Sequence, residues 1–364
     1  MLKTFISLLF FICLICSVLS VNKLSNAQQD PPQEQEVKPE DATIKIQQIL
    51  VNVNVSVIDE KTRTVPNLKL ENFELYCGKI KQEINFFDMG SKPIIMGIVF
   101  DISGSMEPSK YHIARIALRE LMQGQREGDR YFVVLFDKFT STPILNSKTK
   151  SIFTSDPINV TSAIPEYPPK LSTSFYDGVM LGLDILGPEK ESRAYNLLSD
   201  EDKAIVDSTS DKRKILVVIS DGQDNSSRST EREITESLRE KEINIHTITI
   251  TDPQRGTTYA LQGEGIMQSL AKKSGGINFI PEAPHQITEA CSRIRKLISH
   301  QYVLGFYYSG PYDGKFKKFD IKLKPPKGSP KLTAKYREGF IAPLEDKPKA
   351  DKSKDKKVSD PPKK

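Results

Sequence analysis

Apolar runs alternate with stretches of helical periodicity through the middle of the chain. Residues 94–101 form a continuous apolar run, and residues 214–221 contain the apolar run ILVVI, which predicts strands buried on both faces. Between them, Ile113, Ala117 and Leu121 repeat at the spacing of one helix face. The same patterns predict further strands at 131–137, 143–145, 243–252 and 277–281, and helices at 175–186, 231–241, 265–274 and 286–299, with a polar insertion at 189–214.

This alternation indicates an α/β domain over residues 93–300, built on a doubly wound, mainly parallel, Rossmann-like sheet. The flanks, residues 43–92 and 301–342, contain strand patterns without helices between them. Strands need a covered face to be stable, so we expect the two flanks to pair into one small β-rich domain that carries the α/β domain as an insertion. The strand-like segments of the flanks are 45–59, 73–87, 302–309, 315–324 and 332–340.

The N-terminus has the pattern of a secretory signal peptide, with Lys3 before an apolar run at 5–19 and small residues near Ala27. We therefore expect residues 1–27 to be removed. The run is shorter than the ~20 residues that span a bilayer, and we expect no transmembrane segment after cleavage. From this signal peptide we expect a secreted protein, located in the periplasm, in the cell envelope or outside the cell. Residues 28–42 and the Lys-rich residues 343–364 have the composition of a disordered linker and tail.

The composition, 38% apolar and 27% charged in 364 residues, is that of a folded chain with a sizeable core. The formal net charge of +5 comes from the ends, because Lys3 and Lys23 precede the cleavage site and residues 344–364 carry eight Lys against five acids. The body between them is neutral. Nucleic-acid binding by a broad basic face needs clustered cations, so a neutral body argues against it, and we expect no nucleic-acid partner.

Two cysteines remain after the predicted cleavage, Cys77 and Cys291. Each falls on the apolar face of its predicted element, which favours two buried free thiols over a disulfide bridge. Cys13 and Cys16 lie in the predicted signal peptide, and the rest of the chain has no CxxC motif or histidine cluster to support a zinc site.

Four of the apolar runs end on a carboxylate at the same predicted edge of the sheet. Aspartate often begins loops and caps helices, and this explanation suffices for Asp137 and Asp252. The other two, Asp101 and Asp221, differ in the residues that follow them.

The segment DISGS presents three oxygen side chains, Asp101, Ser103 and Ser105, at alternate positions, and Gly104 lets the backbone fold tightly between them. Hydroxyl and carboxylate oxygens without sulfur or imidazole suit a hard cation such as Mg²⁺.

DISGS resembles the DxSxS motif of the von Willebrand factor type A (VWA) fold, whose metal-ion-dependent adhesion site (MIDAS) adds a Thr and an Asp from two later loops. Thr173 in LSTSFYDG and Asp221 in VVISDGQDN occur in that order. The flanks ENFELYCGKIKQEINFF, QYVLGFYYSGPYDGKFKKFDIKLK and TAKYREGFIAP are similar to the VWFA-related domain proteins first described from acidobacteria. The resemblance covers roughly residues 45–343. Departures are Cys77, where the family often has an acid, and Ser172, where a Gly commonly precedes the Thr.

The resemblance implies that Ser103 and Ser105 bind the ion directly, that Thr173 joins them in the ligand-competent state, and that Asp101 and Asp221 act directly or through water. The implied ion is Mg²⁺, with Mn²⁺ or Ca²⁺ as alternatives. Mostly neutral ligands leave a cation electrophilic, with a position that an acidic side chain of a partner protein can fill. The expected function is therefore a secreted, non-enzymatic, metal-dependent protein-binding module of the adhesion type.

Three other functions differ from this expectation in the residues that they require. A haloacid dehalogenase-like phosphatase needs a second Asp as general acid where this chain has Ser103, whose hydroxyl cannot protonate a leaving group near neutral pH. A serine hydrolase would need a GxSxG elbow and a paired histidine, which ISGSM does not provide. A structural envelope module with a non-functional metal site stays open.

Overall fold

The computed structural model of the chain describes residues 48–167, 171–190, 192–208, 212–251, 257–281 and 283–344. The expected signal peptide, the linker at 28–42, residues 345–364 of the expected tail and Asp252 lie outside the described residues. Within the described part of the chain, no helix combines the length and the apolar character that a membrane span requires.

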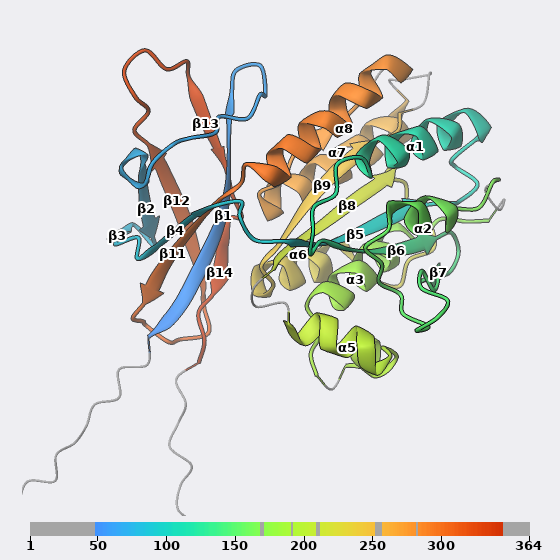
Figure 1. Cartoon of the computed structure of the whole chain (residues 1–364), viewed down its shortest axis with the longest axis horizontal. Coiled ribbons are helices and arrows are strands. Elements are labelled where there is room, and N and C mark those ends of the chain that lie inside the picture. The colour runs from blue at the N-terminus through green and yellow to red at the C-terminus, as the bar shows by residue number, and fades with distance from the viewer. Residues whose placement is uncertain are drawn as a thin grey trace, which may run out of the picture. The chain divides into compact units, whose positions relative to one another are not determined.

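A six-stranded sheet in the order β10-β9-β8-β5-β6-β7 forms the middle of what we call the α/β module (Figure 1). All neighbouring pairs are parallel except β6 and β7, so the predicted mainly parallel sheet is confirmed. Every residue of the central strand β5 is buried, as its unbroken apolar run predicts. The strands are β5 (Ile94–Asp101), β6 (Arg130–Phe136), β7 (Thr140–Ser141), β8 (Arg213–Ser220), β9 (Ile243–Thr249) and β10 (Asn278–Phe279).

Helices pack on both faces of this sheet, because alternate residues of each strand point to opposite sides. Ile98 of β5 belongs to a hydrophobic cluster with α1 and α8, whereas the next residue, Val99, belongs to a second cluster with α3, α6 and α7. The helices are α1 (Pro108–Leu121), α2 (Pro157–Ser162), α3 (Phe175–Leu186), α4 (Arg193–Asn196), α5 (Asp200–Asp207), α6 (Glu231–Glu240), α7 (Thr258–Ser274) and α8 (Pro284–Ser299).

Strands from before and after the α/β module share two antiparallel four-stranded sheets, β13-β1-β11-β4 and β14-β12-β2-β3, which we call the β sandwich. Val53 of β1 lies opposite Leu304 of β11, and Leu75 of β2 lies opposite Ile321 of β12. These four residues belong to one hydrophobic cluster between the sheets. The strands are β1 (Ile49–Asp59), β2 (Phe73–Cys77), β3 (Ile80–Gln82), β4 (Phe86–Met89), β11 (Tyr302–Tyr308), β12 (Phe316–Leu323), β13 (Leu332–Lys335) and β14 (Gly339–Ile341).

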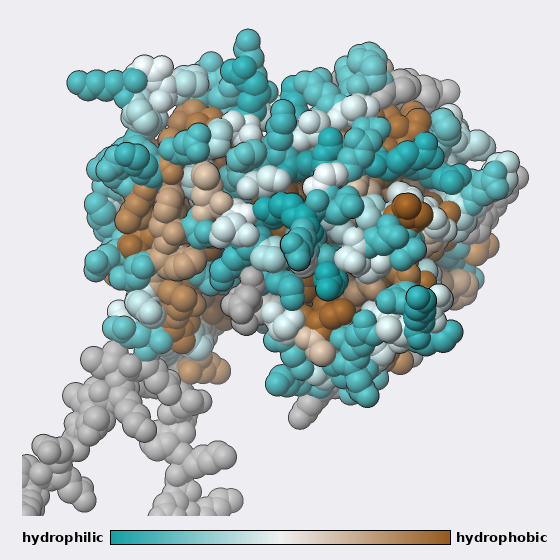
Figure 2. Space-filling model, viewed as in Figure 1, coloured by the Kyte–Doolittle hydropathy of each residue, from teal (hydrophilic) through white to brown (hydrophobic). Residues whose placement is uncertain are grey.

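The β sandwich also presents apolar side chains to solvent. Figure 2 shows apolar residues gathered over the sandwich on the face in view, beside a more polar surface over the α/β module. Exposed apolar residues on its strands include Leu50, Phe86, Met89 and Tyr307. Cys77 and Cys291 are both buried and unbridged, which confirms the prediction of two free thiols.

Several predicted elements differ from the structure. The strand expected at 143–145 is wrong, because the edge of the sheet is instead formed by β7, a short antiparallel partner of β6. The polar insertion at 189–214 contains α4 and α5, and α5 begins at a capping box formed by Ser199 and Asp202. The helix expected from residue 265 begins at Thr258, because the Thr257 side chain caps it by accepting a hydrogen bond from the Ala260 N–H.

Candidate metal centre

Asp101 and Asp221 meet at the carboxyl edge of the parallel sheet. Asp101 is the last residue of β5, and Asp221 directly follows the last residue of β8. β5 and β8 are hydrogen-bonded neighbours in the sheet, so their ends lie side by side. The sequence expectation that both carboxylates lie at this edge is met, and the strand order also makes them adjacent.

The Asp101 carboxylate is fully buried and held at both oxygens. Its Oδ1 accepts a hydrogen bond from the Ser103 N–H at 2.9 Å, and its Oδ2 accepts one from the Ser220 hydroxyl at 2.6 Å. Burial, reinforced by the nearby charge of Asp221, raises the pKa of Asp101 well above its usual range. A cation bound between the two carboxylates would offset the repulsion between their negative charges.

Ser103 and Ser105 connect the Asp101 carboxylate to that of Asp221, through the Ser103 N–H and then the two hydroxyls. Ser103 Oγ and Ser105 Oγ are 3.0 Å apart, and Ser105 Oγ donates a hydrogen bond to Asp221 Oδ1 at 3.3 Å. The same Asp221 oxygen accepts a hydrogen bond from the Gln223 N–H at 3.1 Å. Four of the five residues expected from the sequence therefore form one continuous hydrogen-bonded chain, which we call the Asp-Ser-Ser-Asp chain.

Thr173, the fifth expected residue, is buried on a loop that is hydrogen-bonded to the DISGS turn and to the loop after Asp221. The Gly104 N–H donates a hydrogen bond to the Leu171 carbonyl at 2.9 Å, which joins the Thr173 loop to the DISGS turn. On the other side, the Thr173 N–H donates to Asn225 Oδ1 at 2.9 Å, and the Asn225 N–H donates to the Thr173 carbonyl at 3.0 Å. Within the described residues, the Thr173 hydroxyl makes no hydrogen bond to the other four side chains. Its backbone is thus fixed on both sides, and its hydroxyl is not a member of the hydrogen-bonded Asp-Ser-Ser-Asp chain.

A buried lysine that the sequence interpretation missed also lies in this site. The Lys110 ammonium is 3.2 Å from Asp221 Oδ2, and it donates to the Ser105 carbonyl at 3.1 Å. The Lys110 and Asp221 side chains are only 5% and 4% exposed, so this ion pair is almost fully removed from water. The sequence contained one indication of this role, because Lys110 is a charged residue on the same apolar helix face as Ala114 and Leu121.

The loop that carries Asp221 is supported by close backbone packing against α7. A Cβ atom on Gly263 would lie 2.2 Å from the Asp221 carbonyl oxygen. A Cβ atom on Gly222, whose φ is +76°, would lie 2.4 Å from the Gly263 carbonyl oxygen. Only glycine allows this approach at either position. Nothing in the local sequence around Gly263 distinguished it from an ordinary glycine in a helix.

Asp137, which the sequence assigned to a loop start, has that role. Its Oδ1 accepts a hydrogen bond from the Phe139 N–H at 2.8 Å, and its carbonyl accepts one from the Ser174 N–H at 2.7 Å. Asp137 therefore shapes the turn after β6 and holds the loop next to Thr173.

The donor chemistry of the five residues fits a small hard cation. Two carboxylates and three hydroxyls supply oxygen atoms alone, which is the ligand set that Mg²⁺ and Ca²⁺ prefer. In the part of the chain that the structure describes, no three His, Cys, Asp or Glu side chains gather into a metal-binding group. A site here would depend on the hydroxyls of Ser103, Ser105 and Thr173 as much as on its two carboxylates.

No family model and no curated protein matches the chain. An aerotolerance-related membrane protein from Bacteroides fragilis is 19% identical, with a TM-score of 0.40, over 56% of this chain and 98% of that one. A von Willebrand factor type A protein from Catenulispora acidiphila is 11% identical, with a TM-score of 0.42, over 80% of this chain and 76% of that one. The pilus adhesin SpaC from Lactobacillus rhamnosus is 10% identical, with a TM-score of 0.37, over 76% of this chain and 47% of that one. Solved structures that are similar to this chain therefore include a von Willebrand factor type A protein.

Proposed function

We propose that this chain is a secreted, metal-dependent protein-binding module of the adhesion type, working in the periplasm, in the cell envelope or outside the cell. Its site would capture an Asp or Glu side chain of a partner protein through a bound Mg²⁺, with Mn²⁺ or Ca²⁺ as alternatives. The observation that carries the proposal is the Asp-Ser-Ser-Asp chain at the carboxyl edge of the sheet.

In this proposal some residues bind the cation and others orient the binding groups. Ser103, Ser105 and Thr173 would hold the cation with neutral oxygens, while Asp101 and Asp221 would orient the hydroxyls and balance the charge. A cation bound mainly by neutral oxygens supplies Lewis acidity toward an incoming carboxylate. The hydrogen bonds of the Thr173 backbone would hold its hydroxyl on a fixed loop beside the other four residues.

We propose a binding role in place of catalysis, since Ser103 stands where a haloacid dehalogenase-like phosphatase would need its general acid. We also propose that the α/β module, residues 93–300, is inserted into a β domain made by residues 43–92 and 301–342. The antiparallel pairing of β1 with β11 and of β2 with β12 supports this arrangement.

One observation favours a second candidate, a structural envelope module whose metal site is non-functional. The buried Lys110 ammonium already balances the Asp221 charge and contacts the Ser105 carbonyl. In this second candidate the lysine would replace the cation permanently. In the first, Lys110 would lower the affinity of the site for the cation without abolishing it.

The proposed function is tested by affinity capture from cell-envelope extracts, with wild-type protein as bait. We expect a protein partner to be retained in Mg²⁺, released by EDTA, and absent from Asp101→Ala bait. Asp320→Ala, which removes an exposed carboxylate of the β sandwich, is the control and should capture the partner normally. Circular dichroism verifies that each bait is folded. A partner retained equally in EDTA and by Asp101→Ala would contradict a metal-dependent contact.

Removal of the buried lysine separates the two candidates. For Lys110→Met without metal, we expect the free energy of unfolding to fall by about 1–2 kcal/mol, because Asp221 keeps two hydrogen bonds but loses its counter-charge. We expect its Mg²⁺ affinity to rise by roughly tenfold, because a neighbouring ammonium repels the cation. Urea unfolding and calorimetry measure the two effects.

The matched control for Lys110→Met is Arg119→Met, which removes an exposed charge from the same helix. It should change neither quantity appreciably. A Lys110→Met protein that binds no Mg²⁺ would favour the structural module over the adhesion module.

A further inference from the structure

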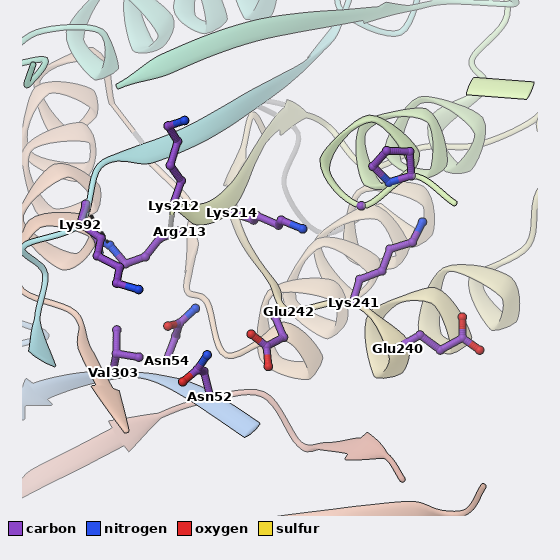
Figure 3. Close-up of a pocket in the computed structure, with 12 residues that line it drawn as sticks. Asn52, Asn54, Lys92, Lys212, Arg213, Lys214, Glu240, Lys241, Glu242 and Val303 are labelled. Atoms are coloured by element: carbon purple, nitrogen blue, oxygen red, sulfur yellow. Dashed lines mark hydrogen bonds between the residues drawn. The ribbon is translucent and has the colours of Figure 1, made fainter. Parts of the chain in front are cut away.

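A cavity of about 360 Å³ lies at the opposite end of β8 from the candidate metal centre, where β8 begins at Arg213. Asn52 and Asn54 of the β sandwich line one side of it (Figure 3). The other side is lined by the start of β8 and by residues at the end of α6. Five of the lining side chains are cationic: Lys92, Lys212, Arg213, Lys214 and Lys241.

The carboxylates that line this cavity do not balance these cations. Among the described residues that line it, Glu240 and Glu242 are the only carboxylates. Glu242 forms an ion pair with Arg337 at 2.9 Å. One cation, Lys241, has a partner outside the cavity, since its ammonium is 2.8 Å from Asp184 Oδ1. Across the described residues, the other four cations have no carboxylate within 4.0 Å. The cavity therefore has an excess of positive charge that the protein leaves uncompensated.

Lys214 is the central member of this group. Figure 3 shows it between the Arg213 and Lys241 sides of the cavity. Its ammonium makes no hydrogen bond to any of the described residues, although the side chain is partly buried. Burial lowers the pKa of Lys214, with the adjacent Lys241 charge acting in the same direction and Glu242 opposing it. An anion in the cavity would supply the counter-charge that this ammonium lacks.

The available donors favour a phosphate over a carboxylate. The Arg213 guanidinium is already engaged, because it donates to the carbonyls of Lys92 and Ile298. Its planar fork, the group best suited to paired contact with a carboxylate, is therefore not free. The remaining cations are ammonium groups, which act as compact point charges and suit an anion that carries more than one negative charge. The volume is also within the range of small-molecule sites.

From these observations we infer that the cavity binds a phosphate group, carried by a small soluble molecule or by a lipid. Lys214 and Lys92 would contact the phosphate oxygens, and the Asn52 amide would close the other side, where the neighbouring Asn54 amide already donates to Asn244 Oδ1 at 3.0 Å. Such a ligand would contact both the β sandwich and the α/β module. This site is separate from the metal-dependent function proposed above and does not depend on it.

The test titrates pyrophosphate into the full chain by calorimetry at low ionic strength with EDTA present. We expect one saturable site, with affinity at least about tenfold weaker in Lys214→Gln and in Lys92→Gln. Lys148→Gln, which removes an exposed lysine from a distant loop, should bind as the wild type does. The Ser103→Ala/Ser105→Ala variant should also bind normally, which separates this site from the metal centre.

A second arm measures sedimentation with phosphatidylcholine vesicles, with and without phosphatidic acid. Binding that requires phosphatidic acid and weakens in Lys214→Gln would assign the phosphate to a lipid headgroup. Pyrophosphate binding without vesicle binding would assign it to a soluble ligand. If neither probe binds, or if Lys214→Gln and Lys92→Gln bind both probes as tightly as wild type does, the proposal is overturned.

Discussion

Mg²⁺ binding is expected to be lost, with affinity reduced by about 100-fold or more, in the double variant Ser103→Ala/Ser105→Ala. The two hydroxyls lie 3.0 Å apart, and that of Ser105 donates to Asp221, so the double substitution would delete two of the proposed neutral ligands at once. Calorimetry with Mg²⁺ or Mn²⁺ should give one site in the wild type and none in the variant. Ser208→Ala, which removes an exposed hydroxyl far along the chain, serves as control.

Stability provides a second measurement for the same variant. A ligand that binds only the folded state raises the free energy of unfolding, by about 2.7 kcal/mol at a hundredfold excess over Kd. Mg²⁺ should therefore raise the melting temperature of the wild type and of Ser208→Ala but leave Ser103→Ala/Ser105→Ala unchanged. If the double variant bound Mg²⁺ as strongly as the wild type does, these serines would not be ligands of the ion.

Gly263→Ala is expected to lower the free energy of unfolding by about 3 kcal/mol and to weaken Mg²⁺ binding. The added Cβ would lie 2.2 Å from the Asp221 carbonyl oxygen, and a backbone atom cannot rotate away as a side chain can. Either α7 or the Asp221 loop must move, so the substitution would disturb the site from outside it. Urea unfolding and calorimetry with Mg²⁺ measure the two effects.

Gly265→Ala is the matched control for this substitution. Gly265 belongs to the same helix and is exposed, and a Cβ there would have no neighbour within 4 Å. Alanine has the higher helix propensity, so this variant should be more stable by about 0.5–1 kcal/mol. The two alanine substitutions should therefore have opposite signs. If Gly263→Ala and Gly265→Ala changed the free energy of unfolding alike, the close approach of α7 to the Asp221 loop would not restrict position 263 to glycine.

Local pattern alone predicted the elements on which the site depends. Continuous apolar runs predicted β5 and β8, because a strand between two helix layers is apolar on both faces. The carboxylates after those runs, with Ser103 and Ser105 at alternate positions, predicted a group of oxygen atoms at the sheet edge. Such features depend on residues close together in the chain, so the sequence contains them directly.

Strand order and strand partners were decided by the tertiary structure. Asp101 and Asp221 are adjacent because β5 and β8 pair, which periodicity cannot specify. Residues 332–340 had the pattern of one strand, yet they form β13 and β14, which join different sheets of the β sandwich. Alternating apolar residues predict a covered face but do not say which sheet covers it.

The contacts around the candidate metal centre were also decided only by packing. Lys110 became part of the site because α1 packs against the sheet and brings its first turn beside Asp221. Gly263 supports the same loop from a helix more than forty residues further along the chain. The cationic cavity likewise unites Lys92, Lys214 and Lys241, which are remote in sequence. Sequence determined which segments are buried and which carry oxygen or charge, whereas the packing of those segments decided which side chains meet, because contacts between distant residues depend on the global fold.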